Sequence, residues 1–276
     1  MSEVQKYLCI LSFATLSWLE LSRIRDSGIL NFQILASSKN SVLIQCPSET
    51  AKQLAKRTGG IFKVGKVCGT SPETLQDCLP LPNTNKFNWT ISGYECDADT
   101  LELTKDIVAQ ILKEASLSKA RFIRPDLDGD DSELKLSNLL RSVLIEEKGK
   151  RVPGVDVIVD YSLGVVHYGY TQFPSDIAGF RDRDFSRPYQ DPTATISPRL
   201  ARTLVNLCGL PQGKTLVDPF CGLGTILQEG LLLGLNVVGI DISSSEVARC
   251  RENLDWFRRQ FKVSPKASSR VIRGNS

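Results

Sequence analysis

Two acidic residues and a pair of glycines carry the clearest chemistry in this chain. Asp218 ends a short apolar run at 215–217, and the turn Pro219-Phe-Cys-Gly-Leu-Gly224 follows it directly. Asp241 ends a second apolar run, 236–240. Glycines lack a Cβ atom, so the backbone of such a turn can approach a ligand closely. The pattern predicts a strand, a glycine turn, a helix start and a second strand that ends in a carboxylate.

This arrangement is suited to S-adenosylmethionine. An acid at the end of the second strand can accept hydrogen bonds from both ribose hydroxyls, as in doubly wound nucleotide sites. Thr225 can cap the helix that follows the turn, so that the positive end of this helix faces the carboxylate of the amino-acid half. The predicted cofactor-binding residues are Asp218, Pro219, Phe220, Gly222, Gly224, Thr225 and Asp241.

Three other interpretations apply to this part of the chain, residues 209–241. A dinucleotide site requires G-x-G-x-x-G, and here Gly222-x-Gly224 is followed by Thr-Ile-Leu. The stretch Gly209–Thr215 resembles a P-loop, but it has three residues between its glycines instead of four and precedes a strand instead of following one. The remaining alternative is an ordinary strand-turn-helix crossover that binds nothing.

Composition narrows the class of protein. The net charge of +3 permits a nucleic-acid partner without requiring one. Eight scattered cysteines, without a C-x-x-C pair, and a single histidine argue against a zinc site and favour free thiols in a reducing cytoplasm. The apolar stretch Tyr7–Phe13 is too short to span a bilayer. We therefore expect a cytoplasmic protein with no metal and no membrane partner.

The pattern of elements predicts several domains, of the α+β and α/β types. A β-α-β-β-α-β rhythm covers residues 1–75, and a proline-rich stretch at 70–85 is expected to be a linker. A second α+β unit is expected at 86–172, with a helix at 134–146. Residues 173–197 form a charged connector. Residues 198–276 alternate helix and strand, as in an α/β domain.

The motif Asp-Pro-Phe-Cys-Gly-x-Gly-Thr at 218–225, together with Arg187-Pro188 and Ser197-Pro-Arg-Leu-Ala-Arg202, resembles the THUMP-containing tRNA guanine-N2 methyltransferases. The similarity is greatest to the archaeal enzymes that modify guanine 10. Residues 86–172 resemble a THUMP RNA-binding domain, and residues 1–75 resemble the ferredoxin-like domain that precedes it in this family.

The resemblance implies a function and further site residues. It implies a class I, Rossmann-like domain at 198–276 that uses S-adenosylmethionine to methylate the exocyclic N2 of a guanine in tRNA. It also adds Pro198 and Arg199 to the cofactor-binding set, because the family builds the methionine side of the pocket from this segment.

A tRNA partner requires flexible cations for its phosphates. The predicted RNA-binding residues are Lys119, Arg121, Arg124, Arg181, Arg183 and Arg187. Further basic candidates lie within residues 1–75, at Lys52, Lys56, Arg57, Lys63 and Lys66.

The sequence departs from the family in one respect. These enzymes hold the target amine with an Asp/Asn-Pro-Pro-Tyr motif, and no such tetrapeptide occurs in the 276 residues. No catalytic residue can therefore be named, and the methyltransferase domain is expected to be incomplete, with strands 1 to 3 of its sheet.

Three hypotheses follow for the protein as a whole. In the first, a second polypeptide supplies the remaining half of the domain. In the second, the chain is a non-catalytic RNA-binding protein or an inactive fragment. In the third, it is an amino-methyltransferase that acts on rRNA or DNA.

Overall fold

The computed structural model describes residues 3–83, 86–117, 119–124, 154–191 and 195–275. The chain divides into two compact units. The first holds the described residues of 1–12, 32–52 and 62–174, and the second holds those of 13–31, 53–61 and 175–276. The helix expected at 134–146 lies outside the described residues.

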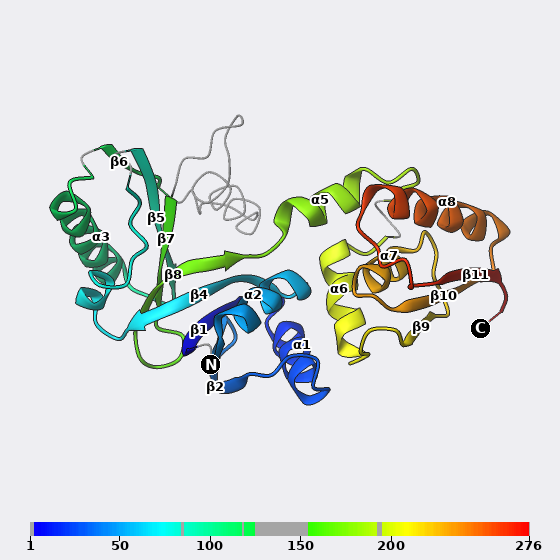
Figure 1. Ribbon diagram of the computed structural model, residues 1–276, viewed down its shortest axis with the longest axis horizontal. Helices are drawn as coiled ribbons and strands as arrows, with labels where there is room; N and C mark the ends of the chain where they lie inside the picture. The colour runs from blue at the N-terminus through cyan, green and yellow to red at the C-terminus, as the bar shows by residue number, and fades with distance from the viewer. Residues whose placement is uncertain (1–2, 84–85, 118, 125–153, 192–194, 276) are drawn as a thin grey trace. The chain divides into compact units, whose positions relative to one another are not determined.

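The first unit is built on one eight-stranded sheet in the order β2-β3-β1-β4-β8-β7-β5-β6 (Figure 1). Its first four strands are β1 (Val4–Leu11), β2 (Gln33–Ser37), β3 (Ser41–Pro47) and β4 (Ile61–Gly69). β1 pairs antiparallel with β3, from Val4 opposite Pro47 to Ile10 opposite Ser41. These strands and the helices between them follow the β-α-β-β-α-β order that the sequence predicts.

The second half of the sheet holds β5 (Lys86–Tyr94), β6 (Lys119–Phe122), β7 (Gly154–Asp160) and β8 (His167–Pro174), with helix α3 (Ala98–Glu114). β5 runs parallel to both β6 and β7. β4 pairs antiparallel with β8, so strands from the ranges 1–75 and 86–172 share one sheet. The bounds of separate domains within this range stay a prediction.

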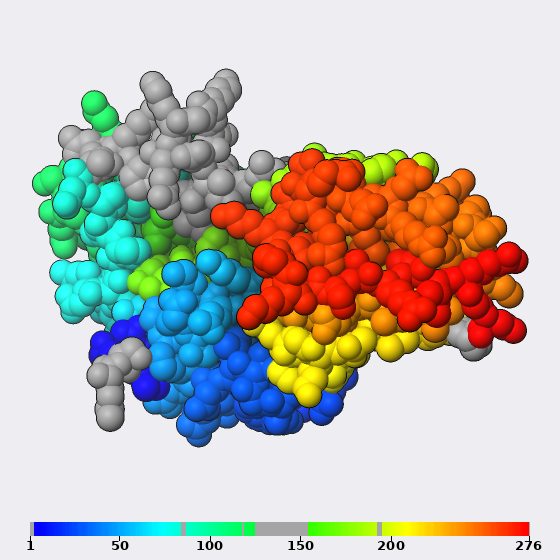
Figure 2. All heavy atoms as spheres, turned by 45° about the vertical axis from the view of Figure 1, so that its right-hand side comes forward, coloured from blue at the N-terminus to red at the C-terminus, as the bar shows by residue number. Residues whose placement is uncertain are grey.

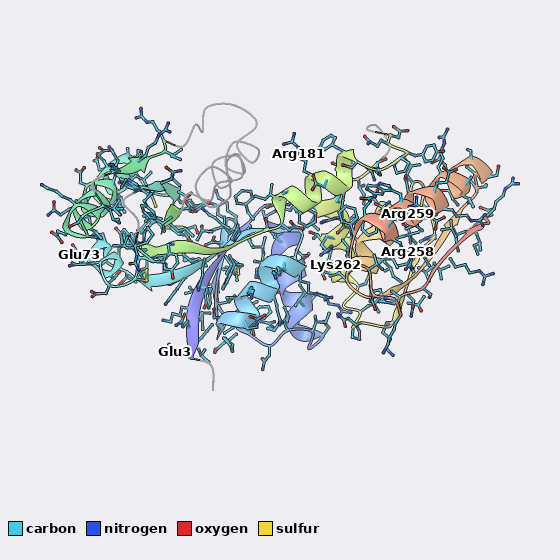
Figure 3. The ribbon with its side chains drawn as sticks, turned by 45° about the horizontal axis from the view of Figure 1, so that its top comes forward. Glu3, Glu73, Arg181, Arg258, Arg259 and Lys262 are labelled. Carbon is cyan, nitrogen blue, oxygen red and sulfur yellow. A yellow bond between two sulfur atoms is a disulfide. The ribbon has the colours of Figure 1, made fainter. Side chains whose placement is uncertain are left out.

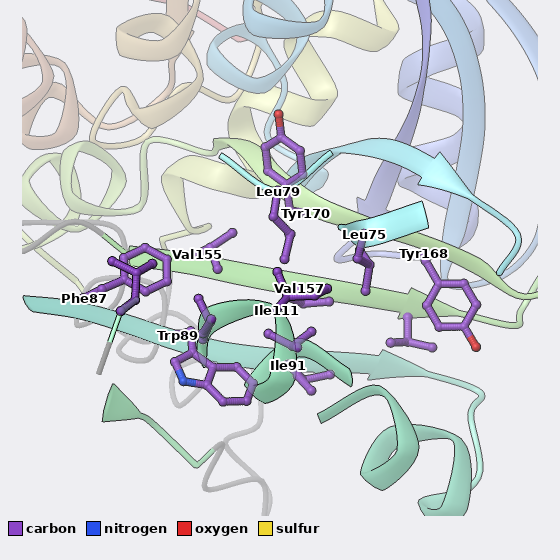
Figure 4. Close-up of a cluster of buried hydrophobic side chains, with 14 residues drawn as sticks. Leu75, Leu79, Phe87, Trp89, Ile91, Ile111, Val155, Val157, Tyr168 and Tyr170 are labelled. Atoms are coloured by element: carbon purple, nitrogen blue, oxygen red, sulfur yellow. The ribbon is translucent and has the colours of Figure 1, made fainter. Parts of the chain in front are cut away.

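The stretch 70–85 is not the linker that its prolines suggested. A 3-10 helix, η1 (Pro72–Leu75), forms here, and Leu75 and Leu79 are buried in the hydrophobic core of the first unit (Figure 4). They pack there with side chains of β5, β7, β8 and α3. Two leucines four residues apart point to the same side of a helical turn, which explains why the segment packs on the sheet.

The expectation of free thiols fails at one pair of cysteines. Cys68, near the end of β4, and Cys78, just after η1, form a disulfide, because the turn between them brings their Cα atoms to 5.7 Å. The other six cysteines are free.

Lys63 is not a surface cation. It is completely buried, and its Nζ donates to Oδ2 of Asp156 at 2.6 Å. Ser92 donates to the other carboxylate oxygen, also at 2.6 Å. A buried lysine requires such a partner, so this residue holds β4 and β7 in place instead of contacting RNA.

The second unit contains a three-stranded parallel sheet in the order β11-β10-β9. Its elements are α1 (Thr15–Asp26), the end of α2 (Ser48–Arg57), α5 (Ile177–Phe185), α6 (Pro198–Leu207), β9 (Thr215–Asp218), α7 (Thr225–Leu232), β10 (Asn236–Asp241), α8 (Ser244–Gln260) and β11 (Ser269–Arg273). α6 packs against both α1 and α7, and α8 lies beside β11 (Figures 1 and 2). Leu227, Leu231, Cys250 and Phe257 are among its completely buried side chains.

A buried carboxylate joins residues far apart in the sequence of this unit. Glu20 on α1 is completely buried and accepts hydrogen bonds from the backbone N–H groups of Gly59 and Gly60, at 3.0 and 2.8 Å. It also accepts one from Nδ2 of Asn206 on α6 at 2.7 Å. These bonds explain why 13–31 and 53–61 belong to the same unit as 175–276.

Two properties bear on membranes and metals. No helix in the described part of the chain is long and apolar enough to cross a membrane. Within the same described ranges, no group of three or more His, Cys, Asp or Glu side chains is placed to hold a metal ion.

Candidate cofactor site

A cavity of about 550 Å³ lies in the second unit, next to the carboxyl end of β9. The turn after β9 and the first residues of α7 supply one wall, and the connector supplies another at 188–191 and 195–196. Glu246 and Arg249 of α8 complete it. Ligands of open parallel sheets bind outside the carboxyl ends of the strands, so the position is that of a ligand site.

The turn is shaped by its glycines. Gly222 has φ of +46° and Gly224 has φ of +88°, a region that favours glycine. A Cβ atom on Gly224 would lie 2.7 Å from Sγ of Cys250, so the backbone packs closely on α8 there. A Cβ on Gly222 would meet nothing within 4 Å, because this glycine borders the cavity.

The two predicted carboxylates have different surroundings. Asp218 is 8% exposed and lines the cavity, and burial raises the pKa of its carboxyl group, although the N–H of Phe220 donates to it at 3.1 Å. Asp241 accepts from the N–H of Gly222 at 3.0 Å and from the N–H of Ser243 at 2.9 Å. It therefore ties the glycine turn to the end of β10.

Most of the predicted cofactor residues gather here. Asp218, Phe220, Gly222 and Thr225 line the cavity, Gly224 packs against Cys250 of α8, and Asp241 lies beside the turn at the end of β10, bonded to Gly222. Thr225 is not the cap of α7, since Gly224 occupies that position; its hydroxyl instead accepts from Nη1 of Arg187 at 2.7 Å.

Pro198 and Arg199 do not line the cavity. Pro198 is the buried first residue of α6. Nε of Arg199 donates to the carbonyl of Gly59 at 3.1 Å, and its guanidinium lies over the rings of Phe13 and Phe180. The residues that reach the cavity are their neighbours Thr195 and Ile196. Pro198 and Arg199 belong to α6, whereas the residues that line the cavity stand just before this helix.

The six predicted RNA contacts divide by burial. Lys119 and Arg121 lie exposed on β6, and Arg124 is exposed just after it. Arg181 is exposed on α5 (Figure 3). Figure 3 also shows Arg258, Arg259 and Lys262 around the end of α8. The exposed residues among these can meet phosphates, whereas Arg258 is half-buried and its Nη2 donates to the carbonyl of Ala267 at 2.8 Å.

Arg183 and Arg187 are buried, so they are not available to RNA. Nε of Arg183 donates to Glu229 on α7 at 2.7 Å. Arg187 bonds to Thr225 and pairs with Asp184 at 3.1 Å, and burial lowers the pKa of its guanidinium. Both arginines anchor the connector to the helix behind the glycine turn.

Sequence reasoning missed Asn253, which links two walls of the cavity. This completely buried residue of α8 donates from Nδ2 to the carbonyls of Tyr189 and Leu223, both at 3.1 Å, and accepts from the N–H of Tyr189 at 3.0 Å. An asparagine next to the buried stripe of Val247, Cys250 and Leu254 was the available signal.

We expect the substitution Asn253→Leu to weaken the binding of S-adenosylmethionine about tenfold and to lower the unfolding free energy by about 2 kcal/mol, because three backbone groups, one buried and two partly buried, lose their partner. Calorimetric titration and thermal unfolding measure the two effects. Asp255→Asn, on the exposed face of the same helix, is the matched control. Unchanged affinity in Asn253→Leu would show that the two walls hold their places without this amide.

The three-stranded parallel sheet, the glycine turn and the acid after the second strand define a class I methyltransferase domain. Solved structures agree in fold. A possible methylase from Clostridium difficile matches with a TM-score of 0.53 and 15% identity, over 98% of this chain and 76% of that one. TrmN from Thermus thermophilus matches with a TM-score of 0.54 and 17% identity, over 98% and 73%.

Sequence comparison shows similarity to tRNA methyltransferases. Residues 185–264 match the RMKL-like methyltransferase domain, UPF0020. The chain is 30% identical over 244 residues to the tRNA (guanine(10)-N2)-dimethyltransferase of Methanothermobacter thermautotrophicus, which covers 86% of this chain and 64% of that protein. The enzyme of the same name from Pyrococcus abyssi is 38% identical over 87 residues, 29% of this chain and 26% of that one. The chain is therefore similar to tRNA guanine-N2 methyltransferases over most of its length, and it spans just under two thirds of the length of the first relative.

Proposed function

We propose that the chain binds S-adenosylmethionine in the cavity beside β9 and takes part in methylating the exocyclic N2 of guanine 10 in tRNA. The observation that carries the proposal is the cavity itself, in which Asp218 and Gly222 border the open space while Asp241 fixes the turn. The names of the relatives supply the substrate, and a tRNA substrate would place the protein in the cytoplasm.

The residues of the cavity suit each part of the cofactor. The buried carboxylate of Asp218 can pair with an ammonium group, and the first N–H groups of α7 can meet a carboxylate. Each carboxylate oxygen of Asp241 accepts one backbone bond and keeps a free lone pair for a ribose hydroxyl. When bound, S-adenosylmethionine supplies an electrophilic methyl group.

The groups that hold the guanine must come from elsewhere, because the 276 residues contain no Asp/Asn-Pro-Pro-Tyr motif. β9 pairs only with β10 among the described strands, and its Val217 is 54% exposed. We propose that a further polypeptide segment, in this or a second chain, adds strands to the free edge of β9. Transfer to an amine then depends mainly on holding the two reactants in line.

Methyl transfer to two tRNA transcripts tests the function. One transcript carries guanosine at position 10, and the other carries inosine, which lacks the exocyclic amine. The protein, supplied with the polypeptide that completes its sheet, is expected to label only the guanosine transcript. Equal labelling of both transcripts would refute N2 of guanine 10 as the target, and preferential labelling of rRNA or DNA would favour the alternative substrates. Binding of tRNA without any affinity for S-adenosylmethionine would favour a non-catalytic RNA-binding protein.

A further inference from the structure

A second cavity of about 560 Å³ lies in the second unit and shares no lining residue with the cofactor site. Its walls come from the end of α1, the last turn of α2, α6, and the segments that flank β9 and α7. Three of its lining residues carry charge, and all three are cations: Lys56, Arg57 and Arg202. Neutral polar groups, including Gln53 and Gln212, also border it. The proposed cofactor chemistry makes no use of this cavity.

Among the described residues, Arg57 has a side-chain donor without a hydrogen-bond partner. Its Nε atom is buried and makes no hydrogen bond within the described part of the chain. Its carbonyl oxygen, by contrast, accepts from Nη1 of Arg202 at 3.2 Å and from Nδ2 of Asn206 at 3.1 Å. The main chain of Arg57 is therefore fixed, and its carbonyl is occupied, while its guanidinium group holds one buried donor without a partner in the described ranges and the residue borders the cavity.

The charge balance around Arg57 is unfavourable for a cation. Burial and, to a lesser extent, the nearby Arg202 lower the pKa of Arg57 to about 10, and Glu20 opposes them. Arg202 already shares its charge with Glu229 at 2.6 Å, and Glu20 is occupied by its own hydrogen bonds. An anion in the cavity would offset the excess positive charge of the three cations that line it.

The size and the donors of the cavity select the class of anion. A guanidinium offers parallel N–H donors that match the oxygen atoms of a phosphate group. Lys56, which is exposed at the rim, adds a second cation, and the neighbouring amides add neutral donors. A polynucleotide presents phosphate groups along its backbone, and the relatives act on tRNA by name.

We propose that this cavity is a phosphate site for the RNA backbone, with Arg57 as its principal donor and Lys56 as its second cation. The inference that the bound phosphate belongs to RNA rests on the proposed function. The inference that the cavity binds a phosphate group rests on the cavity alone. The site would fix the position of the tRNA relative to the methyltransferase domain without reading its bases.

The first experiment measures tRNA affinity as a function of salt concentration for Arg57→Gln. We expect about tenfold weaker binding and a salt slope smaller by about 1, because one charge-assisted phosphate contact is lost. Lys52→Gln is the matched control, since Lys52 lies on the same helix, is paired with Glu49 and does not line the cavity. Arg57→Gln should melt at the same temperature as the wild type or higher, because it removes a partly buried and unpaired charge.

The second experiment separates the phosphate site from the RNA. Inorganic phosphate, compared with chloride at equal ionic strength, should raise the melting temperature of the wild type by about 2–4 °C more than that of Arg57→Gln. If this difference is absent and tRNA affinity is unchanged, the site is refuted. If phosphate raises the melting temperature through Arg57 while Arg57→Gln binds tRNA as tightly as the wild type, RNA is refuted as the ligand of this cavity. A free phosphate compound is then the ligand. If the wild type binds no tRNA, the proposed function fails, and the phosphate titration still decides the site.

Discussion

Replacing Glu229 with glutamine should lower the unfolding free energy of the second unit by about 3–5 kcal/mol. Glu229 is 1% exposed, and its two oxygens accept from Nε of Arg183 at 2.7 Å and from Nε of Arg202 at 2.8 Å. Both guanidinium groups are themselves buried. Removing the shared anion leaves Arg202 without its carboxylate partner and Arg183 with only its longer pair to the exposed Asp176, at 3.4 Å, which costs more than the lost hydrogen bonds alone.

Urea denaturation followed by the fluorescence of Trp256 on α8 measures this effect, in a background in which Trp18 and Trp89 are phenylalanine. Glu246→Gln is the control, because Glu246 forms a partly exposed pair with Arg249 and should cost less than about 1 kcal/mol. Converting Arg183, Glu229 and Arg202 together to methionine should restore most of the lost stability, since no buried charge then remains unpaired. A Glu229→Gln variant as stable as the wild type would show that water or another group compensates the two arginines.

Replacing Asp241 with alanine should weaken the binding of S-adenosylmethionine by at least about a hundredfold. The substitution removes the acceptor for the N–H groups of Gly222 and Ser243 and the proposed acceptor for the ribose. Hydrogen bonds to a charged group contribute about 1.5–3 kcal/mol each, and the loss of two corresponds to this change in affinity.

Calorimetric titration with S-adenosylmethionine measures the loss, and thermal unfolding shows that the variant is folded. Asp241→Asn, which keeps one side-chain oxygen, should fall between alanine and the wild type. Asp255→Asn on the exposed face of α8 should bind normally. Affinity within threefold of the wild type in Asp241→Ala would exclude Asp241 as a ribose ligand.

The elements around the site could be predicted because their signals are local. The apolar runs before Asp218 and Asp241 and the glycine pair between them are enough to indicate β9, the turn, α7 and β10. β9, β10 and β11 form one parallel sheet, as expected for the Rossmann-like domain that the resemblance implies.

Several incorrect predictions concern charged residues, because the sequence shows that a residue is charged but not whether it is buried. Arg183 and Arg187 are cations, as RNA contacts are, yet Arg183 is bonded to Glu229, which is 46 residues away in the sequence. Lys63 likewise depends on Asp156, 93 residues away. Asn253 was missed for the same reason, because the two backbone segments that it joins come together only in the folded chain.

The central claim, that the cavity beside β9 is a cofactor site, is tested most directly by titrating the folded wild-type chain with S-adenosylmethionine. The account predicts saturable binding of one molecule per chain and competition by S-adenosylhomocysteine. Asp241→Ala should lose this binding. Arg199→Ala should bind normally, because the Arg199 side chain bonds to Gly59 and does not line the cavity. A folded chain with no saturable binding, or with equal binding in Asp241→Ala, would contradict it.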